Sequence, residues 1–575
     1  MILLLLLLIA SGYGARRAAL DGWSRVVGFA PAHVQGALPA TGPAPLTGRL
    51  VLILVDGLRS DDTSRLPTLE WLGRQGSRLR LTAPAPAFAG PLTATILTGA
   101  PPALHGFVLP SAHVLAVDSL PAAAARAHVT VGGAGPDTLG ALVGPTLTIW
   151  SPVDSPAALL AQAQKLLGGS GPRLVVLQLD QFHRGLHGVQ IAGPDSPGYL
   201  DLLGDLDATL VQILQQIDLK TTTVLVSGTM PTGPDGRHPP DGEVPLILAG
   251  SGIRPGKLGT GSLTDIAPTA AALLGAPTPL QNQGRPLTET MAAGERTADV
   301  IAQRWLEARK LFVDTELQTF GATDPAPDAP ATLPEAGGYL AALDKRVSEA
   351  RFAYWKRMLP GQAPYLGGAA LVLLVYLGIV LFQRFGGPVF VGAIAYAAVF
   401  HLVFFLTGGR YSAALPGLES PGLSLLIQLA LKIGAGMTAA GLVTGVLLAR
   451  RGFKKSSYLT VVSLHLALTT AAAVALPVVI GLVFVLWSFP VQLAAPGLLV
   501  WFFLTALEVM VIGFGSPLWV AVTVIATRMT AHIWPVKETP PEPPAGGGAG
   551  AGPEARAGRS GRLIHIDTPR RTLRR

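Results

Sequence analysis

Short runs of apolar residues, bounded by polar ones, recur through the first half of the chain. The clearest cover residues 51–55, 174–179, 223–227 and 244–248, and each has the length of a buried β-strand. Stretches rich in alanine and leucine lie between them. Because strands that alternate with helices form parallel sheets covered on both faces, residues 48–290 are expected to form an α/β domain with a mainly parallel sheet sandwiched by helices.

The pattern changes after residue 290. Residues 291–360 form a connector, with helical periodicity over 298–320 and 339–358 and a proline-rich loop at 324–330 between them. Residues 361–534 form an all-α polytopic membrane domain, because a helix needs about 20 apolar residues to cross a bilayer. Five such spans are predicted, at 365–382, 388–408, 423–448, 457–487 and 497–526. A sixth stays open, because Pro477 and Pro517 could break the last two.

The two ends of the chain differ from the rest. Residues 1–20 begin with an intensely apolar run at 2–10, which is short for a span and is interpreted as a signal peptide or signal anchor. Residues 535–575 start with proline, glycine and alanine and end in arginines. This composition predicts a disordered basic tail.

Composition supports a membrane protein. Hydrophobic residues make up 49% of the 575 residues and charged residues only 14%, whereas soluble domains carry about 25% charge. The net charge of +8 does not indicate a nucleic-acid partner, because seven arginines gather in the last twenty residues and another basic cluster lies at 450–455. The absence of cysteine excludes disulfides and thiolate chemistry.

The basic clusters also predict an orientation. Arg384, the 450–455 cluster and the tail follow the first, third and fifth predicted spans. Since cytoplasmic loops are enriched in lysine and arginine, the tail is expected in the cytoplasm and the soluble domain outside it, in a protein of the plasma membrane. Lys432 and Glu508 lie inside predicted spans and are therefore functional candidates, which leaves a transporter with a large outer domain as one alternative.

Two segments bracket the soluble domain in a recognisable way. The first is VLILVDG at 51–57, and the second runs from VPLILAGSGI at 244–253 through LTDIAPT at 263–269 to LLG at 273–275. Together they resemble the alkaline phosphatase superfamily, in its branch of type I phosphodiesterases, nucleotide pyrophosphatases and GPI ethanolamine-phosphate transferases. The resemblance implies a metal-dependent hydrolase or transferase fold, with two metal sites at the carboxyl edge of the sheet and a Ser or Thr nucleophile at a helix N-terminus.

The resemblance carries metal ligands onto several positions of this chain. Asp56 matches the acid that ends the first strand. Asp180, with His183 or His187, resembles the next ligand segment, although the family's spacing falls on Arg184, and His238 matches the late histidine. One divalent metal is implied more strongly than two, with zinc the first expectation, and a chain that binds none is also compatible with these residues.

The nucleophile segment departs from the family pattern. In the family the nucleophile lies ten residues before the glycine of a Thr-Gly pair, which here is Gly99, and that position holds Ala89. Thr93 and Thr82 are the weak replacement candidates. Gly228 and Thr229 stand where the family has an Asp-His ligand pair. His105 matches a histidine that is structural in the family.

Two functions remain open at this stage. The chain is a membrane-anchored phosphoesterase or phosphotransferase that works with one metal, or it is an inactive binding or regulatory module of the same fold, a pseudoenzyme. Its partners are the lipid bilayer and, for the second reading, lipid or glycan head groups.

Overall fold

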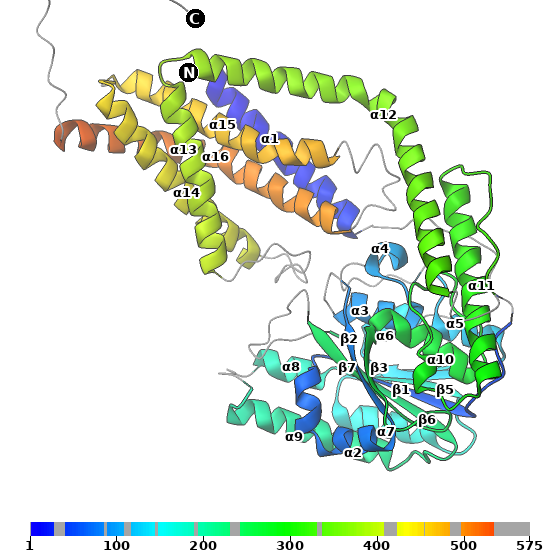
Figure 1. The fold of residues 1–575 in the computed structure, drawn as a ribbon. Coiled ribbons are helices and arrows are strands. Elements are labelled where there is room, and N and C mark those ends of the chain that lie inside the picture. Colours follow the sequence, from blue (N-terminus) through cyan, green and yellow to red (C-terminus); the bar gives the residue numbers. More distant parts are fainter. Residues whose placement is uncertain are drawn as a thin grey trace, which may run out of the picture.

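The fold comes from a computed structural model, shown in Figure 1, in which one long helix runs from a sheet domain to a helical bundle. The structure describes residues 2–27, 39, 41–84, 89–107, 115, 117–143, 146, 148–188, 194–230, 242–330, 336–407, 423–453, 455–482 and 496–533.

Within these residues, eight strands form one sheet in the order β4-β3-β5-β1-β6-β7-β2-β8. The strands are β1 (Arg49–Val55), β2 (Ser77–Thr82), β3 (Val131–Gly135), β4 (Ile149–Pro152), β5 (Leu174–Leu179), β6 (Thr222–Gly228), β7 (Glu243–Gly250) and β8 (Leu258–Ser262). Only β7 runs antiparallel to its neighbours. The mainly parallel α/β fold expected from the sequence is confirmed.

The alternation of side chains along β1 divides the core into two layers. Val51, Ile53 and Val55 face one side of the sheet, while Leu50, Leu52 and Leu54 face the other, and all are fully buried. The first side is covered by α2 (Pro67–Gln75), α7 (Pro156–Leu167), α8 (Gln181–Gly188) and α9 (Pro197–Leu214). The second is covered by α3 (Ala89–Thr98), α5 (Leu120–Arg126), α6 (Asp137–Val143) and α10 (Ile266–Leu274). Burying each such side chain stabilises the domain by roughly 1.5–3 kcal/mol.

Short elements complete the sheet domain. They are the 3-10 turns η1 (Ser60–Arg65), η3 (Leu263–Asp265) and η4 (Thr288–Thr290), and the one-turn helix α4 (Pro102–His105).

The connector consists of two helices that lie side by side, α11 (Glu295–Thr319) and α12 (Ala336–Phe382). Arg309 pairs with Asp344, and Glu316 pairs with Arg351, so the two helices run in the same direction. The proline-rich segment after α11 returns along that helix, where Ala326 N donates to Asp314 Oδ1 at 2.6 Å. The loop predicted at 324–330 therefore has a defined course.

Helix α12 joins the two parts of the molecule. It continues without interruption from the connector into residues 365–382, which the sequence assigns to a separate span. Pro360 and Pro364 lie in its interior, and Figure 1 shows the helix changing direction between the sheet domain and the bundle. Proline removes an intrahelical hydrogen bond and is a common cause of such bends.

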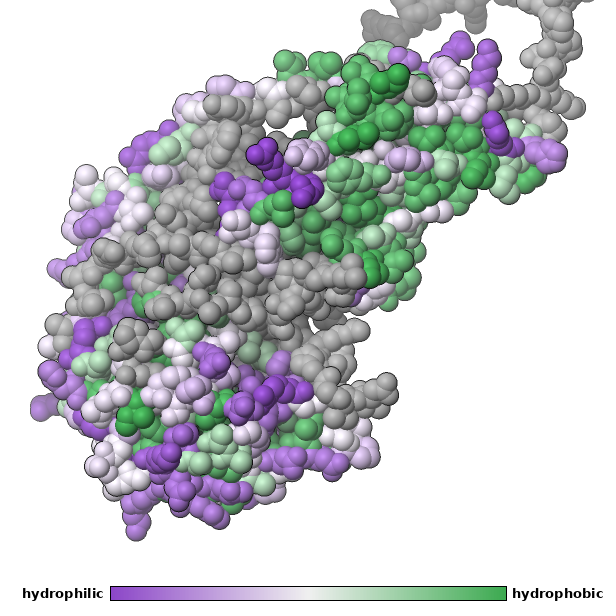
Figure 2. Space-filling view, turned by 180° about the vertical axis from the view of Figure 1, so that it is seen from behind, coloured by the Kyte–Doolittle hydropathy of each residue, from purple (hydrophilic) through white to green (hydrophobic). Residues whose placement is uncertain are grey.

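Five helices of the described chain are long and apolar enough to cross a membrane. Their apolar segments are Ile2–Arg25, Gly386–Leu406, Leu426–Arg450, Ser456–Leu476 and Phe502–Ile533. They lie in α1 (Ile2–Val27), α13 (Gly386–Leu406), α14 (Leu423–Arg450), α15 (Ser456–Leu482) and α16 (Pro496–Ile533). Neither Pro477 nor Pro517 breaks its helix. Figure 2 shows hydrophobic residues spread over the outside of the bundle, as lipid contact requires.

The N-terminal segment is longer than the sequence pattern indicated. The apolar run at 2–10 is the first part of a 26-residue helix, so the expectation that it is too short to span is wrong. Helix α1 packs along α16: Leu8 is fully buried, and a Cβ placed on Gly513 would lie 2.7 Å from the Cα of Gly12. Small residues at a crossing let two membrane helices approach closely. Whether the segment is cleaved or retained stays a prediction.

Candidate functional site

The parallel register brings three segments of the predicted site together at the carboxyl edge of the sheet. Val55, the last residue of β1, lies opposite Leu179 of β5 and Gly228 of β6. Neighbouring strands are about 4.8 Å apart, so the residues that follow them are adjacent. These residues are Asp56, Asp180 and Thr229. The edge also binds ligands in other open α/β sheets.

Asp56 is the centre of a buried hydrogen-bond network. Its side chain accepts a hydrogen bond from Thr229 Oγ1 at 2.7 Å, and Gln178 Nε2 lies 3.0 Å from both carboxylate oxygens. The same amide nitrogen reaches Thr93 Oγ1 at 3.4 Å. All four residues are buried, with Asp56 only 3% exposed. The carboxylate oxygens therefore face neutral side-chain donors.

The protonation of Asp56 follows from these surroundings. Burial raises the pKa of the Asp56 carboxyl to about 7, while hydrogen bonds from Thr229 and Gln178 act in the opposite direction and the negative charge of Asp180 adds a further increase. A carboxylate in a low-dielectric interior without a cation is costly, and uptake of a proton relieves that cost.

The helix that would carry the nucleophile begins at Ala89, the position identified from the sequence. A methyl group can neither attack phosphorus nor bind a metal. Thr93 lies one turn further along α3, where it is 1% exposed and its hydroxyl faces Gln178. Thr82 ends β2, which is three strands away from β1 in the sheet, and its hydroxyl donates to Gly261 O at 3.2 Å. Three strand spacings amount to about 14 Å, so Thr82 does not belong to this site.

His105 has structural contacts. It is buried, its Nδ1 accepts a hydrogen bond from Phe107 N, and its Nε2 lies 3.1 Å from Thr95 Oγ1. Burial lowers the pKa of the His105 imidazole to about 3, so the ring is neutral. Its partners tie α4 and the following residues to α3.

The second group of predicted ligands is only partly described. Asp180 lies 3.1 Å from Arg184 Nη2, in an ion pair whose two side chains are 23% and 50% exposed. Burial raises the pKa of Asp180, and the charge of Arg184 acts against that increase. His183 lies close to the residue that follows Asp56: a Cβ atom added to Gly57 would be 3.5 Å from the Cβ of His183. The side chain of His187 and all of His238 lie outside the described residues.

The residues around Asp56 do not fit a divalent metal. Zinc sites use three or four nitrogen, oxygen or sulfur ligands, whereas the described hydrogen-bond partners of the Asp56 side chain are the amide nitrogen of Gln178 and the hydroxyl of Thr229. Among the described residues there is also no group of three or more His, Cys, Asp or Glu side chains that could hold a metal ion. The set formed by Asp180, His183, His187 and His238 stays a prediction.

The sequence interpretation overlooked Gln178. It lies in a strand whose other residues are all apolar, and its side chain is 3% exposed. A glutamine in such a strand signals a buried polar partner, because unpaired amides are rarely buried. Its partner could be identified only from the register between β5 and β1.

The two charged residues inside predicted spans, Glu508 and Lys432, have different partners. Tyr396 of α13 donates from its hydroxyl to Glu508 Oε1 of α16 at 2.6 Å. Lys432 of α14 lies over the ring of Phe404, 5.2 Å from the ring centre. Each charge therefore contacts an aromatic side chain of α13.

Part of the sheet domain is similar to known proteins. A family model described as type I phosphodiesterase / nucleotide pyrophosphatase matches residues 50–109. No curated protein sequence matches the chain.

Several solved structures share part of the fold at low identity. Murine ectonucleotide pyrophosphatase / phosphodiesterase 5 is 12% identical, with 42% of this chain and 100% of that chain covered and a TM-score of 0.37. The human form is 12% identical, with 43% and 100% covered and a TM-score of 0.35. A protein from Pyrococcus horikoshii is 14% identical, with 40% and 97% covered and a TM-score of 0.30. Likeness at this level carries no argument about activity.

The family-model match begins in β1 and includes Asp56, His105 and the position of Ala89, where the chain departs from the family pattern. Residues 50–109 are thus similar to the type I phosphodiesterase / nucleotide pyrophosphatase family, and they lie in a domain with a mainly parallel sheet covered by helices on both faces.

Proposed function

We propose that the chain is a membrane-attached pseudoenzyme, in which a phosphodiesterase-like domain serves as a binding or regulatory module. The observation that carries the proposal is the hydrogen bonding of Asp56. In a working site of this kind the carboxylate would coordinate a metal, but here its oxygens accept from Gln178 and Thr229. Ala89 at the start of α3 also leaves the family's nucleophile position without a hydroxyl group.

The loss of a single catalytic element would support a pseudoenzyme less strongly. A missing nucleophile can be replaced by a metal-activated water, and a missing ligand by a neighbouring side chain. Here alanine stands at the nucleophile position, Gly228 and Thr229 stand at the positions of the Asp-His pair, and the Asp56 oxygens accept hydrogen bonds from uncharged donors. Gln178 and Thr229 hold Asp56 through uncharged donors, although Gln178 Oε1 itself has no hydrogen-bond partner among the described residues, and these contacts favour a retained fold over a retained reaction.

The test is hydrolysis of bis(p-nitrophenyl) phosphate by the purified full-length protein with zinc or manganese. We expect no turnover above the metal-only background, and no gain from Ala89→Thr alone, because the second-site ligands are also absent. Thr93→Ala, Thr82→Ala and His238→Ala serve as comparisons. Wild-type turnover lost in Thr93→Ala or Thr82→Ala would show an intact but shifted nucleophile, and turnover lost only in His238→Ala would show hydrolysis with one metal.

The proposal also places the sheet domain outside the cytoplasm of a plasma-membrane protein. Arg451 Nη1 donates to Arg384 O at 2.7 Å, which supports a common side for two of the three basic segments. Protease added to intact cells should then digest the sheet domain and spare the C-terminal tail. Digestion of the domain only after lysis would contradict this orientation.

A further inference from the structure

A cavity of about 360 Å³ lies where α11, α12 and the α4 region meet, and its lining includes none of the residues of the candidate functional site. Leu104, Phe312 and Val347 contribute apolar side chains to its lining. Four charged residues also line it, two from α11 and two from α12: Arg309, Glu316, Asp344 and Arg351. The volume is within the range of small-molecule sites.

Glu316 is the unusual member of this lining. It is only 6% exposed, yet within the described chain its carboxylate accepts no hydrogen bond. The nearest cation is Arg351, whose Nη2 lies 3.7 Å away, beyond hydrogen-bonding distance. Burial raises the pKa of Glu316, and the charge of Arg351 works against that increase. The Glu316 carboxylate lines the cavity and has an ion-pair partner but no hydrogen-bond donor among the described residues, so it is suited to a donor from a ligand.

Arg351 has the complementary property. Its Nε is buried and has no hydrogen-bond partner among the described residues. Its guanidinium carbon lies 5.6 Å from the centre of the Phe320 ring, which supports the group from one side without using its N–H donors. A negative charge and a positive charge thus stand next to each other in one cavity, both with unused hydrogen-bonding capacity.

The other two charges are already engaged. Arg309 donates to Gln283 and, at 3.3 Å, to Asp344 Oδ1. Asp344 lies at the rim, where its side chain is 69% exposed. The capacity to bind a ligand is therefore concentrated at Glu316 and Arg351.

We propose that this cavity binds a small zwitterion, whose ammonium group donates to Glu316 while its anionic group accepts from Arg351. The four lining charges sum to zero, so a neutral ligand with two separated charges satisfies both open groups and leaves the net charge unchanged. A ligand with one charge satisfies only one of them. Charge-assisted hydrogen bonds of this kind are stronger than neutral ones.

The position in α12 favours a freely diffusing ligand over a lipid head group. Arg351 precedes the predicted span at 365–382 by 14 residues, which corresponds to about 21 Å along a helix. The proposal therefore takes a freely diffusing ligand as the occupant.

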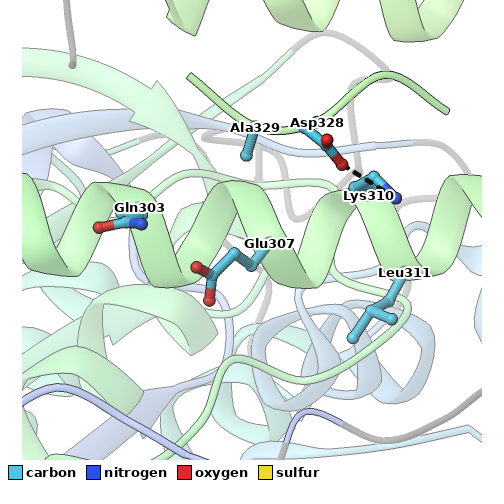
Figure 3. A pocket seen from close by; sticks show the side chains of 6 residues that line it. All are labelled: Gln303, Glu307, Lys310, Leu311, Asp328 and Ala329. Atoms are coloured by element: carbon cyan, nitrogen blue, oxygen red, sulfur yellow. Dashed lines mark ion pairs between the residues drawn. The ribbon is translucent and has the colours of Figure 1, made fainter. Parts of the chain in front are cut away.

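A second cavity of the same volume provides an internal control. It lies between α11 and the returning segment and is lined by Gln303, Glu307, Lys310, Leu311, Asp328 and Ala329 (Figure 3). Its charges already have partners: Lys310 donates to Asp314 at 3.1 Å and lies 3.8 Å from Asp328, and Glu307 accepts from Arg304 at 3.0 Å. We expect no zwitterion binding there.

The experiment is calorimetric titration of the full-length protein, in detergent, with taurine and with glycine, beside methylamine and acetate as singly charged probes. We expect both zwitterions to bind and Glu316→Gln and Arg351→Gln each to weaken binding by about tenfold or more, the effect typical of a lost charged hydrogen bond. Glu307→Gln should bind as the wild type does. Glu316→Gln removes a buried charge and should fold, which the melting temperature checks.

Three outcomes would overturn the proposal: no binding of either zwitterion, equal binding of the singly charged probes, or wild-type affinity in both cavity variants. Repeating the titration in nanodiscs with and without phosphatidylethanolamine distinguishes the ligand's source. Unchanged affinity supports a free small molecule, whereas competition by that lipid would show that its head group is the occupant and that the site is nearer the membrane than inferred. Phosphodiesterase assays do not enter this test, so it stands or fails apart from the proposed function.

Discussion

Asp56 and Asp180 follow neighbouring parallel strands, yet their surroundings differ. Asp56 is buried and accepts hydrogen bonds from neutral groups, whereas Asp180 is partly exposed and pairs with the cation Arg184. Both pKa values are raised by burial, but only Asp180 has a nearby positive charge acting against the increase. Position at the sheet edge therefore does not decide the hydrogen bonding and charge environment of a carboxyl group. Its nearest side chains do.

The largest expected effect concerns Asp56 and pH. Its folded-state pKa of about 7 is above the ordinary value of 3.8, so between these pH values the folded protein binds more protons than the unfolded protein. Stability should therefore fall as pH rises through this window, by about 4 kcal/mol in total. Asp56→Asn should remove this component and be more stable than the wild type at pH 8. Thermal unfolding of both proteins at pH 5.5 and pH 8 measures the difference.

In that experiment the wild type should lose more melting temperature than Asp56→Asn on going from pH 5.5 to pH 8. Equal changes in the two proteins would show that Asp56 titrates normally, because a cation near it stabilises its charge.

The next effect concerns the donor to Asp56. Thr229→Val keeps the shape of the side chain but removes the hydroxyl, which should destabilise the protein by about 1–3 kcal/mol. The loss should be larger at pH 8, where Asp56 is ionised, than at pH 5.5. Thr229→Ser restores the hydroxyl and should recover most of the stability in the same thermal unfolding assay. An equal loss at both pH values would indicate a packing defect.

The smallest effects belong to exposed positions. Arg184→Gln breaks the ion pair with Asp180 and should change stability by less than about 1 kcal/mol, because partly exposed ion pairs contribute little. Thr82→Ala, at the exposed end of β2, should change it by less than about 0.5 kcal/mol. If Arg184→Gln were as damaging as Thr229→Val, the two carboxyl groups would be more alike than the structure indicates.

Much of the fold could be predicted from the sequence, because four strands are continuous apolar runs. The predictions at 51–55, 174–179, 223–227 and 244–248 agree with β1, β5, β6 and β7 to within two residues. Strands β2, β3, β4 and β8 were not predicted. β3 and β8 are rich in glycine, and β2 alternates polar with apolar residues at a length that also suits a loop. Their pairing partners, which are distant in sequence, stabilise them as strands.

The sequence by itself determined that the nucleophile position holds alanine, that cysteine chemistry is absent, and that long apolar helices follow the α/β domain, since each depends only on residue identity and spacing. Only the tertiary structure decided which side chains surround the Asp56 carboxylate. Gln178 is 122 residues from Asp56 and faces it because β5 lies beside β1 in one register; Thr229 is 173 residues away and arrives at the end of β6. A one-residue slip would turn Gln178 to the opposite face of the sheet, so contacts of this kind cannot be read from any local pattern.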